Sequence, residues 1–178
     1  MFETTTILPG LEIEPKVQSL GIYTVDSGTV GDFGRISKLV NCEHWLDKEL
    51  APSRFLNIGN WPAGVKDNVE LLAVCFGKTI PNPNVLSEKV QLFISEHVDL
   101  DLASFPHLAT QLDEEKIKWL CQQGIAWLVV VDEASIRCDS SGNFCNPIVF
   151  SNYKHHGLSA HRVENLIDED SYILFYRK

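Results

Sequence analysis

Apolar residues recur along this chain with two different periods, which predict strands alternating with helices. Residues 16–25 alternate between two sets of side chains, as a strand with two unlike faces does. Residues 69–76 and 125–131 are short and almost wholly apolar, which indicates strands covered on both faces. Residues 172–176 form a similar apolar run and predict a last strand.

Helical spacing marks two longer segments. Residues 32–50 carry apolar side chains three and four positions apart, and Pro52 prevents the helix from continuing. Residues 86–98 fit a helix but also alternate, and we favour the helix, with Ser87 as the residue that caps its first turn.

A third helix is predicted from its end signals. Thr110 followed three residues later by Asp113 resembles a capping box, and Gly124 is a typical residue just beyond a helix end. The acidic residues that follow Asp113 suit the positive end of a helix dipole.

Residues 136–138 and 144–150 flank a turn sequence and predict a hairpin. If Ser141-Gly142 is its tip, Cys138 lies directly opposite Cys145, where β-carbons are about 4.5 to 5.5 Å apart. The pair could then form a redox switch, or both could be reduced thiols on one face.

Strands and helices interspersed with a hairpin favour the α+β class. With 178 residues and 20.0 kDa, the chain fits a single globular domain over residues 1–178. We expect a compact domain with a mixed, largely antiparallel sheet and two or three packed helices. A chain of this length buries about 70% of its surface on folding, so its core requires no metal or disulfide.

Composition narrows the class of partner. The net charge of −9 repels nucleic acid and anionic membrane surfaces, which leaves a protein as the expected partner. The N-terminus lacks a secretory signal, the longest apolar run has seven residues, and five cysteines suit a reducing compartment. We therefore expect a soluble, cytoplasmic protein that does not enter a membrane.

The segment Asn41-Cys42-Glu43-His44-Trp45 resembles the Asn-Cys-Glu-His-Phe box of the lecithin retinol acyltransferase and phospholipase family, relatives of the NlpC/P60 peptidases. The resemblance implies a cysteine hydrolase or acyltransferase in which the thiolate of Cys42 attacks an ester or amide carbonyl. That family places its histidine before the cysteine, whereas every histidine outside the box follows Cys42 here. His97 is the candidate base and acid, provided that its segment is a strand.

Other candidate sites have simpler explanations. Cys42 completes an apolar stripe in the predicted helix, as a buried core cysteine would. His155, His156 and His161 cluster near the C-terminus, but their spacing matches no metal motif, so we expect a solvated loop and no metal. Glycine-rich phosphate loops are also missing, and we expect no cofactor.

The sequence therefore favours a binding or regulatory protein, of the inhibitor or immunity type, that acts through a protein partner. Trp61, in an Asn-Trp-Pro loop, is the candidate anchor for that contact. The alternative is the cysteine-dependent hydrolase or acyltransferase at Cys42.

Overall fold

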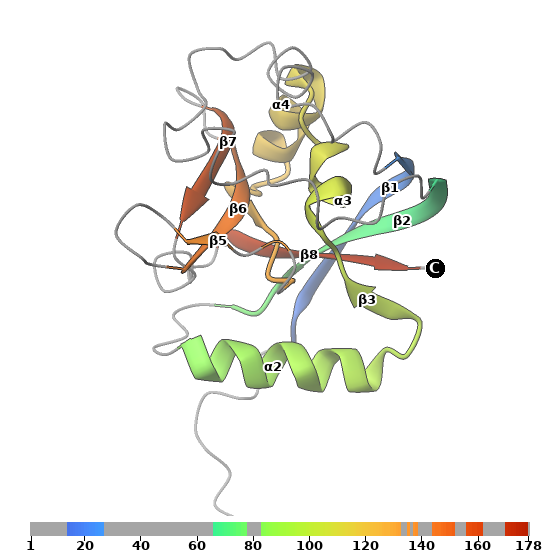
Figure 1. The fold of residues 1–178 in the computed structure, drawn as a ribbon, viewed down its shortest axis with the longest axis vertical. Helices are drawn as coiled ribbons and strands as arrows, with labels where there is room; N and C mark the ends of the chain where they lie inside the picture. The colour runs from blue at the N-terminus through green and yellow to red at the C-terminus, as the bar shows by residue number, and fades with distance from the viewer. Residues whose placement is uncertain are drawn as a thin grey trace, which may run out of the picture.

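A computed structural model describes residues 14–26, 66–77, 83–132, 135, 137–138, 144–151, 156–161 and 170–177. Within these residues the chain forms eight strands and three helices (Figure 1). The strands are β1 (Lys16–Asp26), β2 (Lys66–Cys75), β3 (Leu100–Leu102), β4 (Trp127–Val129), β5 (Arg137–Cys138), β6 (Phe144–Ser151), β7 (His156–His161) and β8 (Ser171–Arg177). The helices are α2 (Pro83–Glu96), α3 (Phe105–Ala109) and α4 (Glu114–Gln122).

Strand β8 is paired along both of its edges. One edge pairs with β2 in antiparallel register, from Glu70 opposite Arg177 to Val74 opposite Ile173. The other edge is shared, because β4 pairs in parallel with residues 171–173 and β3 pairs antiparallel with residues 175–177. Of the strand pairs in the described residues, β4 with β8 is the parallel one, which confirms the predicted mixed, largely antiparallel sheet.

The sheet continues from β8 to either side. The main order is β1-β2-β8-β4-β6-β5, with β7 added on β6. Strand β6 pairs with β4 and β5 through different residues and with β7 along residues 146–151. The predicted hairpin is confirmed as the antiparallel pair of β5 and β6.

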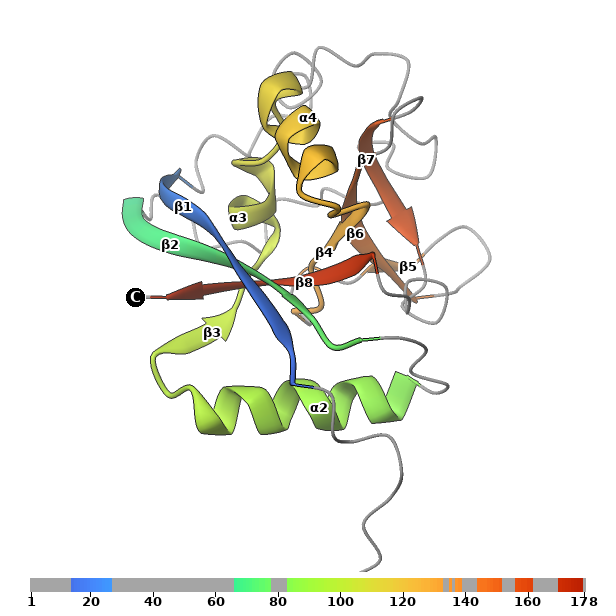
Figure 2. The same ribbon diagram turned by 180° about the vertical axis from the view of Figure 1, so that it is seen from behind.

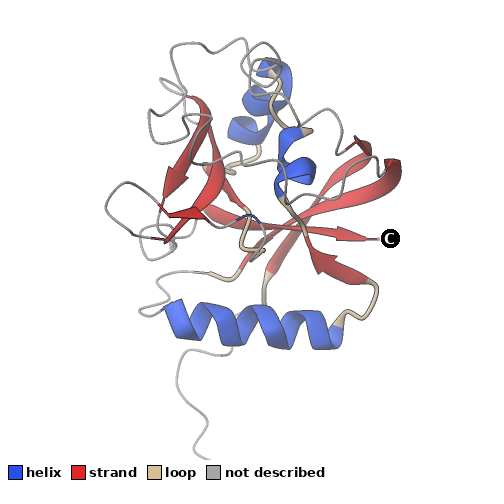
Figure 3. Ribbon diagram, in the orientation of Figure 1, coloured by secondary structure: helices blue, strands red, loops and turns tan. Residues whose placement is uncertain are grey.

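Alternating side chains on the central strands divide the core into two layers. Leu71, Ala73 and Leu174 belong to the cluster that includes residues of α3 and α4, whereas Leu72 and Phe175 belong to the cluster that includes α2. Figures 2 and 3 show α2 on one side of the central strands and α3 and α4 on the other. Both faces of the central strands are therefore covered, as the unbroken apolar runs predict.

Helix α2 settles the ambiguous segment in favour of the helix. Its buried face includes Val90 and Phe93, and the Phe93 ring lies 5.6 Å from Phe76 and 5.3 Å from Phe175, centroid to centroid, in edge-on contacts. The helix begins at Pro83, so the predicted cap at Ser87 is wrong, because Ser87 lies inside the helix.

Helix α4 is confirmed, but its cap is Asp113 alone. The Asp113 carboxylate accepts the backbone N–H groups of Glu115 and Lys116 at 2.9 and 3.2 Å. Thr110 is instead the C-cap residue of α3, so the predicted capping box is wrong. Gly124 follows the C-cap with a φ of +75°, a conformation that suits glycine and confirms the predicted end of the helix.

Strand β1 contains a bulge. Its register to β2 shifts between Ser19, opposite Leu72, and Gly21, opposite Leu71, so that Leu20 is inserted. Gly21 has a φ of +106°, which a residue with a side chain rarely adopts. Beyond the bulge, Ile22 shares a face with Ser19, although their numbers differ in parity.

The remaining sequence predictions have mixed outcomes. The strands predicted at residues 16–25, 69–76 and 172–176 are confirmed as β1, β2 and β8, although β2 ends at Cys75. The strand predicted at residues 125–131 is confirmed as β4, which is shorter than predicted. The predicted loop at the C-terminal histidines is wrong for residues 156–161, which form β7. The helix predicted at residues 32–50 and His155 lie outside the described residues, and the single domain over residues 1–178 stays a prediction.

Replacing Phe93 with alanine is expected to lower the free energy of unfolding by about 3–5 kcal/mol, because it empties the contact between α2 and the sheet. Urea unfolding measures the change. Leu92→Ala on the same helix is the matched control, since Leu92 is half exposed, and it is expected to cost roughly 0.5 kcal/mol. Equal losses in the two variants would contradict the described packing.

Asp113→Ala is expected to destabilise the chain by about 1 kcal/mol, because two backbone N–H groups at the start of α4 lose their acceptor. Thermal unfolding of this variant beside Asp113→Ser checks the cap, since serine can still accept a hydrogen bond there. The cap is contradicted if alanine and serine give the same midpoint.

Candidate functional site

The residues of the predicted cysteine site are only partly described. Cys42 and the proposed anchor Trp61 lie outside the described residues. His97 directly follows α2, and its Nδ1 lies 2.9 Å from the carbonyl oxygen of Phe93, so Nδ1 carries the hydrogen and donates it. The His97 imidazole also lies against the Phe93 ring, with 4.2 Å between the ring centroids. Because this segment is a helix, the strand geometry that the hydrolase hypothesis needed at His97 is absent.

The two hairpin cysteines do not lie opposite each other. The register pairs Cys138 with Phe144, and Arg137 with Cys145. The predicted pairing is therefore wrong by one residue, and a shift of one residue exchanges the faces of a strand. The side chains of Cys138 and Cys145 lie outside the described part of the structure, so the redox switch itself stays a prediction.

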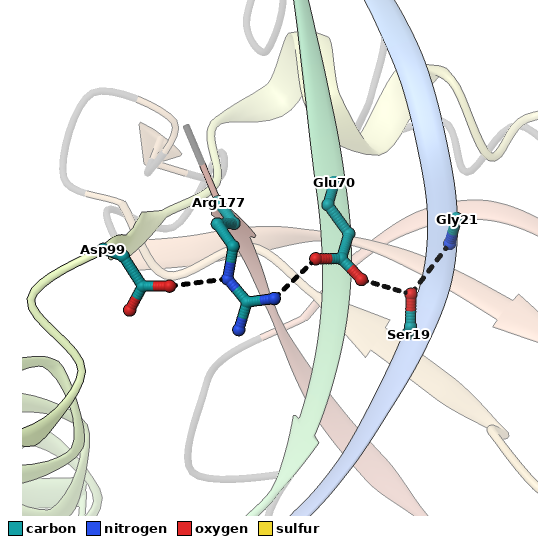
Figure 4. Close-up of polar contacts among 5 residues, drawn as sticks. All are labelled: Ser19, Gly21, Glu70, Asp99 and Arg177. Carbon is teal, nitrogen blue, oxygen red and sulfur yellow. Dashed lines mark hydrogen bonds and ion pairs between the residues drawn. The ribbon is translucent and has the colours of Figure 1, made fainter.

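A polar network crosses the sheet at the carboxyl end of β8 (Figure 4). Arg177 Nη1 donates to Glu70 Oε2 at 2.7 Å, and Arg177 Nε lies 2.6 Å from Asp99 Oδ2. The other carboxylate oxygen of Glu70 accepts the hydroxyl of Ser19 at 2.7 Å. Ser19 Oγ in turn accepts the backbone N–H of Gly21 at 3.3 Å, at the bulge of β1. The network therefore joins β1, β2, β8 and the turn before β3.

Strand register explains why these side chains meet. Ile22 lies opposite Glu70, and Glu70 lies opposite Arg177, so all three stand in one row on the α2 face of the sheet. Along β2 and β8 this face is apolar further from the network, at Leu72 and Phe175, where it faces α2. The polar row thus begins beyond the end of the helical cover.

Two large apolar side chains accompany the network, and both are exposed. Val98, next to Asp99 in the turn, is 91% exposed, and Ile22 is 77% exposed. We call Ile22, Glu70, Val98, Asp99 and Arg177 the end patch. Its charges are two carboxylates and one guanidinium, so it is acidic overall.

The opposite face of the same strand end holds a half-buried histidine. The His107 ring stacks on Tyr176 at 4.5 Å, centroid to centroid, and its Nδ1 accepts the backbone N–H of Ser104 at 3.1 Å. Burial lowers the pKa of His107, and the carboxylates of Asp132 and Asp67 oppose the shift. Nδ1 must be unprotonated to accept the N–H, so the geometry also selects neutral imidazole.

The Ser104 hydroxyl lies 2.9 Å from the same Nδ1, but the pair differs from a catalytic dyad. In a dyad the imidazole lone pair is available to take the serine proton. Here that lone pair already accepts the backbone N–H of Ser104. The arrangement therefore stabilises the first turn of α3.

The described part of the chain was compared with two kinds of functional feature, a metal site and a membrane-spanning helix. No group of three or more His, Cys, Asp or Glu side chains in it is placed to hold a metal ion. None of its helices is long and apolar enough to cross a membrane.

Sequence reasoning missed the end patch. Glu70 is the charged residue within the predicted apolar run at residues 69–76, and Arg177 is a charged residue at the next alternate position after Ile173 and Phe175. A charged residue in the row of a buried face indicates where the cover of that face ends. Only the register, however, places Glu70, Arg177 and the distant Asp99 together.

The lowered pKa of His107 predicts a loss of stability with acid. Above about pH 6.5 His107 is neutral in both the folded and the unfolded chain, and its full contribution to the free energy of unfolding is present. As the pH falls below this value the unfolded chain binds the proton first, so the free energy of unfolding decreases until the folded pKa is reached. Urea unfolding between pH 7 and pH 5 should show a flatter dependence in His107→Gln than in the unmodified chain.

Tyr176→Phe is the control for this measurement, because it keeps a ring stacked on His107 and adds no group that titrates in this range. It is expected to keep the slope of the unmodified chain. A His107→Gln profile parallel to that of the unmodified chain would show that His107 does not cause the pH dependence.

Comparison of the chain with protein-family models, with curated proteins and with solved structures found no match. Its function is therefore argued from its own residues.

Proposed function

We propose that this chain is a binding or regulatory protein, of the inhibitor or immunity type, that acts in the cytoplasm through a protein partner with a basic contact surface. The observation that carries the proposal is the distribution of charge. Residues 90–115 contain six carboxylates and no lysine or arginine. They include Glu96, Asp99 and Asp101 around the turn before β3, and all three are exposed.

This distribution favours a basic protein over the other classes of partner. Two groups of exposed carboxylates, at residues 96–101 and 113–115, attract a basic surface, speed the encounter and disfavour partners of like charge. Nucleic acid and anionic lipid carry the opposite requirement, a basic surface on the protein. Of the exposed lysines in the described part of the chain, Lys118 lies 2.6 Å from the Glu114 carboxylate, and Lys16 lies over the Tyr172 ring.

The hydrolase alternative differs in its requirement for a reactive thiol. Its base, His97, donates its Nδ1 hydrogen to a helix carbonyl, so only Nε2 could serve Cys42. We therefore use Cys42 as a control in testing the binding function.

The test is cross-linking of the full chain in extracts at about 50 mM and about 500 mM salt, where screening over the Debye length separates charge-driven binding. A stoichiometric protein partner is expected at low salt, insensitive to nuclease and markedly reduced at high salt. Cys42→Ser is expected to capture the same partner in the same amount.

Capture that nuclease abolishes would contradict a protein partner, and the absence of any stoichiometric partner would contradict the function itself. Rapid alkylation of Cys42 by iodoacetamide at neutral pH, together with loss of an ester hydrolase activity in Cys42→Ser, would favour the enzyme instead.

A further inference from the structure

We propose that the end patch is the docking surface for a basic segment of the partner, in which an arginine or lysine lies between aliphatic side chains. The inference rests on the proposed function and adds the place and the chemistry of the contact. Three properties of the patch support it. The patch has exposed apolar side chains, a carboxylate oxygen of Asp99 that can accept a further hydrogen bond, and an ordered support of paired strands and ion pairs.

The apolar groups define the two sides of the surface. Val98 and Ile22 are the two most exposed large apolar side chains in the described part of the chain, at 91% and 77%. They lie on either side of the Glu70–Arg177–Asp99 network, Ile22 opposite Glu70 in the sheet and Val98 beside Asp99. Removing such side chains from water favours association, and aliphatic groups of a partner would cover them.

The charges define the centre. Arg177 forms ion pairs with both carboxylates, which reduces its attraction for an anionic ligand. Glu70 uses one oxygen for Arg177 and the other for Ser19. Asp99 uses Oδ2 for Arg177, no hydrogen bond or ion pair joins its Oδ1 to another described residue, and its side chain is 55% exposed. A guanidinium or ammonium group arriving at the patch would therefore bind Asp99 Oδ1.

The strands and side chains that support the patch are already ordered. Glu70 and Arg177 stand on paired strands, Ser19 fixes Glu70 from the third strand, and the Arg177 contact fixes the Asp99 turn. A surface that needs little ordering on binding keeps more of the interaction energy as affinity. A second copy of this chain fits the centre less well, since it would bring acidic groups against acidic groups.

The experiment is an NMR titration of the full chain with the capped peptide acetyl-Ser-Val-Arg-Val-Ser-amide. Backbone amide shifts are expected to concentrate at residues 21–23, 69–71, 97–100 and 176–177. The same peptide with glutamate in place of arginine is expected to cause no such shifts.

Variants separate the patch from general attraction. Asp99→Asn is expected to weaken peptide binding about tenfold, the loss that corresponds to one charge-assisted hydrogen bond. Val98→Ser tests the apolar side and is also expected to weaken binding. The matched controls are Glu115→Gln, which removes one exposed charge on α4, and Val17→Ser, which removes a partly exposed valine of β1 outside the patch. Both are expected to leave the peptide affinity unchanged.

Three results would overturn the inference. Shifts centred on α4, or equal weakening by Glu115→Gln and Asp99→Asn, would show non-specific attraction. Sedimentation that shows a dimer lost in Val98→Ser would assign the surface to a second copy. A cross-linked partner that still binds Val98→Ser/Asp99→Asn with unchanged affinity would place docking elsewhere and leave the proposed function intact. Failure of that function is recognised separately, by the absence of any partner.

Discussion

Burial of β8 on both faces requires cover from two sides of the sheet. Ile173 and Phe175 enter the layer beneath α2, and Tyr172 and Leu174 enter the layer that includes α3 and α4. The strand also has hydrogen-bonded neighbours on both edges, with β2 on one and β4 and β3 on the other. Residues of every described helix therefore belong to a core cluster that includes residues of β8.

The same strand ends in two different polar environments. Tyr176 turns to the α3 face and stacks on His107, whereas Arg177 turns to the α2 face and binds Glu70 and Asp99. Alternation of side chains thus separates a half-buried, neutral histidine from a partly exposed, charged network only one residue away. The stacked contact contributes to the stability of α3, and the charged network belongs to the docking surface that we propose.

Local sequence patterns predicted those strands that consist of an apolar run and the helix that has one apolar face. The strands at residues 16–25, 69–76 and 172–176 are present, and so is the helix at residues 86–98. Helix α3 was missed because five residues cannot show a helical period, although Pro106 suits a helix start. The cap of α4 was misplaced because Thr110 and Asp113 are both good cap residues, and only the accepted N–H groups distinguish them.

Long-range features could not be predicted in the same way. The predicted Cys138–Cys145 pairing rested on an assumed register, and the observed register differs from it by one residue. The Glu70–Arg177 contact joins residues 107 positions apart, and nothing local in either strand indicates its partner. His97 could be placed only once its segment was known to be helical, since the Phe93 carbonyl becomes its acceptor only at a helix end.

The bulge at Leu20 also bears on how the sheet ends. Among the described strands, β1 lies at one edge of the sheet. A long edge strand is a template on which a strand of another molecule can pair, which leads to aggregation. The inserted residue and the positive φ of Gly21 interrupt the regular spacing of backbone groups halfway along this edge. A foreign strand could match only one half of β1 at a time, so the chain protects itself from edge-to-edge association by its backbone, without a proline or a lysine at the bulge.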